Sequence, residues 1–286
     1  MTPDSTPAAA PERPPLWRAV LLVLAAYGFL AGVPYVRGVP PPLATLLATL
    51  LFLVLSLLVV AELAKYPLRP WRDFLGLVVC LGAWYAVGLS ARSLEAFRTL
   101  VAAASGVSFL LACIFAGRLL ALIIRERNIL LPVALVAGLA DIFTVLAGPT
   151  GKALEKAPKL VEKLSVAIPQ VGSATGPAGA RGLTHVATAG LGDFIFLAFF
   201  LAAVWRCGLR RQGTFWGILL AAGLGMVLVL FLPHVPALPL LPFIVTGFLI
   251  ANAGAFSLSR REKTQVAAVV LAIAGALLVV GLLQRR

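Results

Sequence analysis

The sequence has few acidic residues, few histidines and few cysteines. Of its 286 residues, 11 are Asp or Glu, two are His and three are Cys. Cys80, Cys113 and Cys207 lie on three separate apolar segments without metal-ligand spacing, so neither a disulfide framework nor a thiolate metal centre is expected. His185 and His234 lie near segment ends, and no carboxylate triad accompanies them. We therefore expect no metal and no cofactor.

The sequence also has too few charges for a water-soluble domain. Hydrophobic residues make up 61% of the chain, charged residues make up 12%, and the mean hydropathy is +1.01. A soluble domain of this length cannot bury so much apolar surface. The chain is therefore predicted to be a multi-pass integral membrane protein in a lipid bilayer, and its compactness favours a prokaryotic cell membrane.

The net charge of +13 does not indicate a nucleic-acid partner. Lys and Arg occur in short clusters between apolar segments, at 125–128, 206–211 and 259–263. Such clusters are typical of topology signals and of anchors to lipid headgroups.

The apolar runs predict an all-α polytopic protein with about nine transmembrane helices. The runs are continuous and do not alternate, which favours helices over a β-barrel, and several Trp residues lie near their ends. The expected spans are 16–36, 42–62, 73–90, 100–124, 129–148, 184–205, 215–232, 236–254 and 264–283.

Two aspartates lie deep inside apolar runs, where a bilayer disfavours charge. They are Asp141 and Asp193, while the other nine acidic residues lie in polar connections or near segment ends. A carboxyl at membrane depth indicates chemistry or transport. Because the two spans are consecutive and antiparallel, both side chains are expected roughly 12 to 14 Å from the same membrane face. Gly138 and Gly190, at i−3 of each aspartate, should let a second helix approach.

A pair of contacting carboxyls can hydrolyse a peptide bond. Two such groups cannot both ionise cheaply, so the pair holds one proton. The ionised member can take a proton from water, and the protonated member can stabilise the oxyanion. A peptide bond in a transmembrane helix must first be unwound. The proline-rich segment 233–239, followed by Pro242, is suited to pair with such a strand.

Three motifs resemble the presenilin and signal peptide peptidase family of GxGD-type intramembrane aspartyl proteases. The segment GLGDFIF at 190–196 resembles the GxGD motif, and PAL at 236–238 resembles the family's PAL motif. Asp141, followed by Val145, Leu146 and Pro149, resembles the first catalytic motif. The resemblance covers about residues 129–253. This sequence departs from the family in having Ala140 before the first aspartate, where Tyr is usual, and in having four spans before the Asp141 span, where five are usual.

The resemblance implies an aspartic endopeptidase with a presenilin-like catalytic core. Its catalytic residues would be Asp141 and Asp193, and its substrates transmembrane helical proteins. The residues implied to shape the site and bind substrate are Gly190, Leu191, Gly192, Pro236, Ala237 and Leu238.

The expected organisation follows from these motifs. Residues 1–15 form a disordered tail, 16–128 a bundle of about four spans, 129–254 the catalytic core, and 255–286 a C-terminal transmembrane helix. Within the core, the loop 150–183 begins with an amphipathic stretch, 151–169, and continues as a flexible linker.

Two other functions remain open. The same carboxylates could serve as a relay in a proton-coupled transporter or channel, although no internal repeat supports an inverted-repeat transporter. The chain could also be an inactive relative that binds transmembrane helices, a hypothesis that Ala140 supports. Outside the core, Arg118 is interpreted as snorkelling to the interface, and Glu62 with Lys65 as an interfacial pair.

Overall fold

The computed structural model describes residues 15–36, 38–90, 97–146, 165–169, 185–231 and 240–257, with a few isolated positions after 263. The described part of the chain is predominantly helical. Its helices and strands, in chain order, are α1 (Leu16–Gly32), η1 (Val33–Tyr35), α2 (Pro41–Ala64), α3 (Pro70–Ser90), α4 (Arg98–Ala121), η3 (Arg127–Ile129), α5 (Leu130–Leu146), β1 (Ser165–Pro169), β2 (His185–Gly190), α8 (Leu191–Arg206), α9 (Arg211–Phe231), α10 (Leu241–Asn252) and η5 (Ala253–Ala255).

Four of the described helices are long and apolar enough to cross a membrane. They correspond to the first four expected spans, and cover Leu16–Tyr35, Leu46–Ala64, Pro70–Ser90 and Arg98–Ala121. Large apolar side chains on their outer faces are exposed, as a lipid-facing surface requires. The expected ninth span, 264–283, lies largely outside the described residues.

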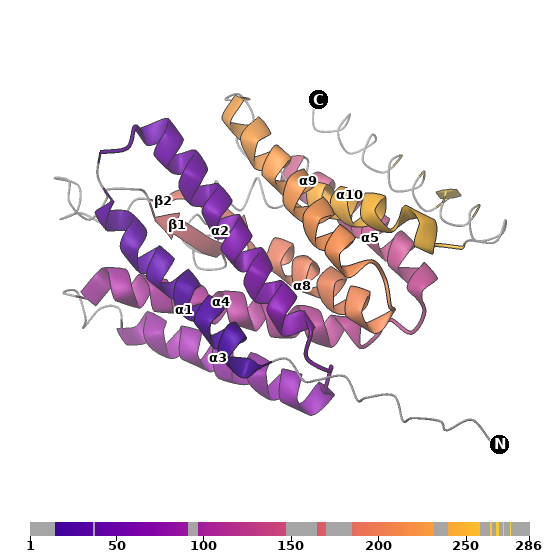
Figure 1. Cartoon of the computed structure of the whole chain (residues 1–286), viewed down its shortest axis with the longest axis horizontal. Helices are drawn as coiled ribbons and strands as arrows, with labels where there is room; N and C mark the ends of the chain where they lie inside the picture. The colour runs from indigo at the N-terminus through magenta and orange to yellow at the C-terminus, as the bar shows by residue number, and fades with distance from the viewer. Residues whose placement is uncertain are drawn as a thin grey trace, which may run out of the picture.

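Helix α8 lies at the centre of the bundle. Every residue from Leu197 to Val204 is buried, so this helix has no polar face over two turns. It packs against α4 and α2 on one side and against α9 and α10 on the other. Figure 1 shows α1 to α4 gathered on one side of α8, and α5, α9 and α10 on the other. The ring of Phe200 on α8 stacks on Phe248 of α10, with 4.7 Å between ring centroids.

The all-α prediction is confirmed for the fold as a whole, with one local exception between α5 and α8. There β1 and β2 form a two-stranded antiparallel sheet, in which Ser165 pairs with Gly190 and Ile168 with Ala187. The predicted amphipathic stretch is therefore a strand from residue 165 to 169, and the expected span 184–205 begins as a strand. The remainder of the loop, including the predicted linker, lies outside the described residues.

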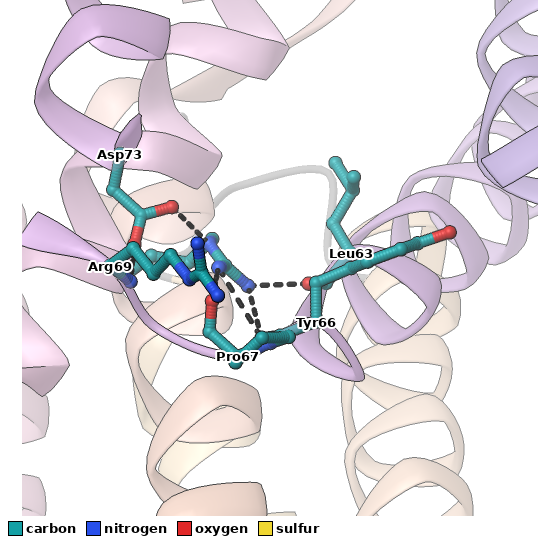
Figure 2. Close-up of polar contacts among 6 residues, drawn as sticks. Leu63, Tyr66, Pro67, Arg69 and Asp73 are labelled. Atoms are coloured by element: carbon teal, nitrogen blue, oxygen red, sulfur yellow. Dashed lines mark hydrogen bonds and ion pairs between the residues drawn. The ribbon is translucent and has the colours of Figure 1, made fainter. Parts of the chain in front are cut away.

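Arg118 does not snorkel to the membrane surface, contrary to the sequence interpretation. The side chain is 4% exposed, and its Nε donates to Asp73 Oδ1 at 2.8 Å; Asp73 itself is 3% exposed. The guanidinium also donates to the carbonyl oxygens of Leu63, Tyr66 and Pro67 (Figure 2). Because these carbonyls lie in the last turn of α2 and in the residues that follow it, Arg118 fixes the α2–α3 connection to α4. The expected pair of Glu62 and Lys65 is confirmed as an ion pair beside it.

A glycine determines the geometry of the turn from α8 to α9. Gly208 has a φ of +65°, the left-handed conformation that glycine adopts at low cost. The N–H of Leu209 donates to the carbonyl of Val204 at 3.0 Å, the bond that closes a Schellman motif. This turn reverses the chain and places α9 antiparallel to α8.

Candidate active site

Asp141 lies on α5 and faces the beginning of α10. Its Oδ2 accepts a hydrogen bond from the backbone N–H of Leu241, at 3.2 Å. Leu241 is the first residue of α10, and Pro242 follows it within the first turn. The first N–H groups of a helix have no partner within the helix and carry the positive end of its dipole. The N-terminus of α10 therefore provides a favourable position for the Asp141 carboxylate.

Asp193 lies in the first turn of α8, not in the middle of a helix as the sequence suggested. Its Oδ2 accepts a hydrogen bond from the backbone N–H of Gly190 at 3.2 Å, and Gly190 is the last residue of β2. An acidic side chain at the third helical position commonly caps the helix in this way. Asp193 is thus held at the junction between strand and helix.

The structure brings the two aspartates together. The carboxyl of Asp193 lies within electrostatic range of Asp141 and near the start of α10 at Leu241. Three elements distant in sequence, α5, the β2–α8 junction and the start of α10, therefore meet at one point. Two carboxyls and two backbone donors gather there, and both aspartates are partly buried.

The packing of α5 against α10 agrees with part of the prediction. A Cβ built at Gly138 would lie 3.6 Å from Val245 on α10, so the small residue preceding Asp141 does lie against a second helix. The same argument is wrong for Asp193, because Gly190 belongs to a strand.

The other GxGD residues border Asp193. Leu191 is 39% exposed, and a Cβ at Gly192 would meet no atom within 4 Å. The surface beside Asp193 is therefore open at these two residues. A Cβ at Gly190 would meet only Asp193 Oδ2, at an ordinary 3.5 Å, so packing in the described residues does not explain why this position is glycine.

The predicted PAL residues Pro236, Ala237 and Leu238 lie outside the described residues. The motif ends three residues before Leu241 in the sequence. Sequence reasoning missed the Leu241 N–H because it considered side chains alone. A signal was present in Pro242, since proline in the first turn marks a helix start and hence a group of unpaired N–H donors.

Gly117 sets the position of α8, the helix that carries Asp193. A Cβ built at Gly117 would lie 2.3 Å from the carbonyl oxygen of Ile195 and 2.7 Å from the Cβ of Ala198. The nearest atom belongs to the backbone, so a side chain at this position must displace α8 itself. Ile195 is two residues from Asp193, which makes the α4–α8 crossing a determinant of where the carboxyl lies.

Gly117→Ala is therefore expected to lower the unfolding free energy by about 1–3 kcal/mol, the usual cost of overpacking. The measurement is the unfolding temperature of the purified protein in detergent. Gly82→Ala on α3 is the matched control, because a Cβ there meets no atom within 4 Å; its unfolding temperature should not fall, since alanine favours a helix over glycine. Equal unfolding temperatures for both variants would contradict the tight crossing.

Comparison of the chain with protein-family models, with curated proteins and with solved structures finds no match.

Proposed function

We propose that this protein is an intramembrane aspartyl protease that cleaves peptide bonds within transmembrane segments of other proteins. One observation carries the proposal: Asp141 and Asp193, from separate helices, lie close enough to interact, beside the backbone N–H of Leu241 that bonds Asp141. Two carboxyls that face each other in a partly buried site cannot both ionise cheaply, so such a pair shares a proton.

The shared proton supplies both halves of an acid–base mechanism. The ionised carboxylate takes a proton from water while the water oxygen bonds to the scissile carbonyl carbon, and the protonated carboxyl gives its proton to the carbonyl oxygen. The resulting diol gives one hydroxyl proton to the ionised carboxylate as the C–N bond breaks, and the departing amine takes a proton from the protonated carboxyl, which returns the dyad to its shared-proton state. The N–H groups of Leu241 and Gly190 would keep both carboxyls oriented throughout.

In this proposal, an unwound substrate binds along the β1–β2 sheet. The described sheet has only two strands, so each strand has an outer edge whose N–H and C=O groups can pair with an extended peptide. Strand β2 leads directly into α8, so a peptide lying along this sheet is directed towards Asp193. The open surface at Leu191 and Gly192 leaves room for it.

The proposal also includes the number of membrane spans and the helices that form the catalytic core. Helices α5, α8, α9 and α10 would form a presenilin-like core, and the C-terminal apolar run would complete nine spans. The motifs at 190–193 and 236–238 support this assignment, and Asp141 occupies the corresponding position on the preceding span.

The proposal is tested by incubating the purified protein with a tagged single-span reporter in liposomes. We expect two product bands, formed by the unchanged protein and suppressed by a transition-state-analogue inhibitor of aspartic proteases. Proton flux into the liposomes without product bands would instead support the transporter hypothesis. Reporter binding without cleavage or flux would support an inactive helix-binding relative.

A further inference from the structure

A cavity of about 380 Å³ lies at the end of the bundle where α2, α4 and α8 terminate. Ala64, Leu122 and Ala202 contribute apolar surface to it, and Lys65, Tyr66 and Arg206 contribute hydrogen-bond donors. No acidic residue is among those described around it. The cavity takes no part in the aspartate site.

Both walls of this cavity are fixed by arginine side chains. On one side, Arg118 donates to the carbonyl of Leu63 in the last turn of α2 and to those of Tyr66 and Pro67 in the connection after it. On the other, Arg206 Nη1 donates to the carbonyl of Ala121 at 3.1 Å. These bonds engage carbonyls at the ends of α2 and α4, groups that would otherwise repel an anion. The walls of the cavity are therefore held in place without a ligand, and these carbonyls do not prevent an anion from binding there.

Two donors of the residues around the cavity, the Tyr66 hydroxyl and the Arg206 guanidinium, have hydrogen-bonding capacity that no described residue uses. The Tyr66 hydroxyl is buried and makes no hydrogen bond to any residue that the structure describes, and its ring points away from the Arg118 cluster (Figure 2). Burial, followed by the nearby Glu62, raises the pKa of Tyr66, so the phenol remains a proton donor at neutral pH. Arg206 uses one described bond of the five that a guanidinium can donate.

The charge balance around the cavity is positive. Glu62 pairs with Lys65, and Asp73 pairs with Arg118. Arg206 has no described acidic partner, and Arg211 lies over the ring of Trp205 at 3.6 Å, beside the cavity. Arg206 and Arg211 are thus two positive charges beside the cavity that have no acidic partner among the described residues.

The position of the cavity indicates the kind of anion. It lies where two membrane-length helices, α2 and α4, end, which is the level of lipid headgroups. Trp205 lines it, and tryptophan is enriched at that level. A cavity lined by both apolar side chains and hydrogen-bond donors fits a phosphate that carries an apolar tail.

We propose that this cavity binds the phosphate of an anionic phospholipid, with Arg206, Lys65 and the Tyr66 hydroxyl as its donors. The ligand chemistry is a phosphate ester held at the bilayer surface. A water-soluble phosphate ester offers the same group without a tail, so the experiment must separate the two sources.

The test is native mass spectrometry of the full chain in detergent, titrated with phosphatidylglycerol, phosphatidylcholine of the same acyl chains, or glycerol phosphate. We expect one retained phosphatidylglycerol with an affinity about tenfold above that of phosphatidylcholine, which corresponds to one strong charge-assisted contact. Arg206→Gln should lower the phosphatidylglycerol affinity by about tenfold. Tyr66→Phe, which removes only an unpaired hydroxyl and should leave folding intact, should lower it about three- to tenfold.

Arg125→Gln is the control, because Arg125 is exposed and does not line the cavity; its affinity should be unchanged. Equal affinities for the two lipids would overturn the proposal, as would equal losses in Arg125→Gln and Arg206→Gln, which would indicate diffuse surface charge. Unchanged binding in Tyr66→Phe would remove the hydroxyl from the site. Glycerol phosphate that binds as tightly as the lipid would overturn the assignment to a membrane source.

Discussion

Replacing Asp141 or Asp193 by Asn is expected to lower the rate of reporter cleavage by about 10²–10⁴-fold, the range that general acid–base groups contribute. Asparagine keeps the size of the side chain and an oxygen that can accept the N–H of Leu241 or Gly190. It cannot exchange a proton with water. The double variant should be no slower than the slower single variant, because the two carboxyls act as one unit.

Glu126→Gln serves as the control for this measurement. Glu126 is an exposed acid in the α4–α5 connection, and its loss should leave the rate within about twofold. The unfolding temperature of each variant separates lost chemistry from lost structure. Cleavage retained within about tenfold in either single Asn variant would refute the dyad, whereas two losses that multiply in the double variant would refute its action as a unit.

The first half of the fold could be predicted because each of its helices is a continuous apolar run. The starts and ends of α1 to α4 lie close to the expected spans, and the third, α3, begins at Pro70, three residues before its expected start. Proline at a helix start and apolar length are local signals, so tertiary contacts were not needed to read them.

The region around Asp193 could not be predicted in the same way. His185–Gly190 is short and apolar, and such a segment continues a helix as readily as it forms a strand. The pairing with Ser165–Pro169 decides the outcome, and that partner lies in a connection interpreted as membrane-surface and linker. The prediction that Asp193 lies inside an uninterrupted helix was therefore wrong, although the structure does bring the two aspartates together.

Arg118 shows a different limit of sequence reasoning. A basic residue near the end of an apolar run usually extends to the interface, and the sequence offers no local acid to hold it. Its partner, Asp73, lies 45 residues earlier, at the start of another helix. Arg118 and Asp73 meet only because α3 packs against α4.

Arg118→Met is expected to lower the unfolding free energy by about 3–5 kcal/mol, the cost of leaving one member of a buried ion pair uncompensated. The substitution keeps much of the apolar stem. It removes the partner of Asp73 Oδ1 and the donors to the carbonyls of Leu63 and Tyr66. The loss should appear as a lower midpoint in reversible unfolding by sodium dodecyl sulfate from mixed micelles.

Two further variants show which interactions account for the unfolding free energy lost in Arg118→Met. Arg98→Met, in the same helix at an exposed position, should change the unfolding free energy by less than about 0.5 kcal/mol. Adding Asp73→Leu to Arg118→Met removes the stranded carboxylate and should recover part of the loss, because replacing a whole buried pair by apolar groups costs far less than breaking it. The unfolding free energy that the double variant does not recover then measures the cost of leaving the carbonyls of Leu63, Tyr66 and Pro67 without a donor. This cost is about 1–3 kcal/mol for each carbonyl that water does not reach. Full recovery in the double variant would mean that these carbonyls find water, and no recovery would mean that the ion pair itself contributes little.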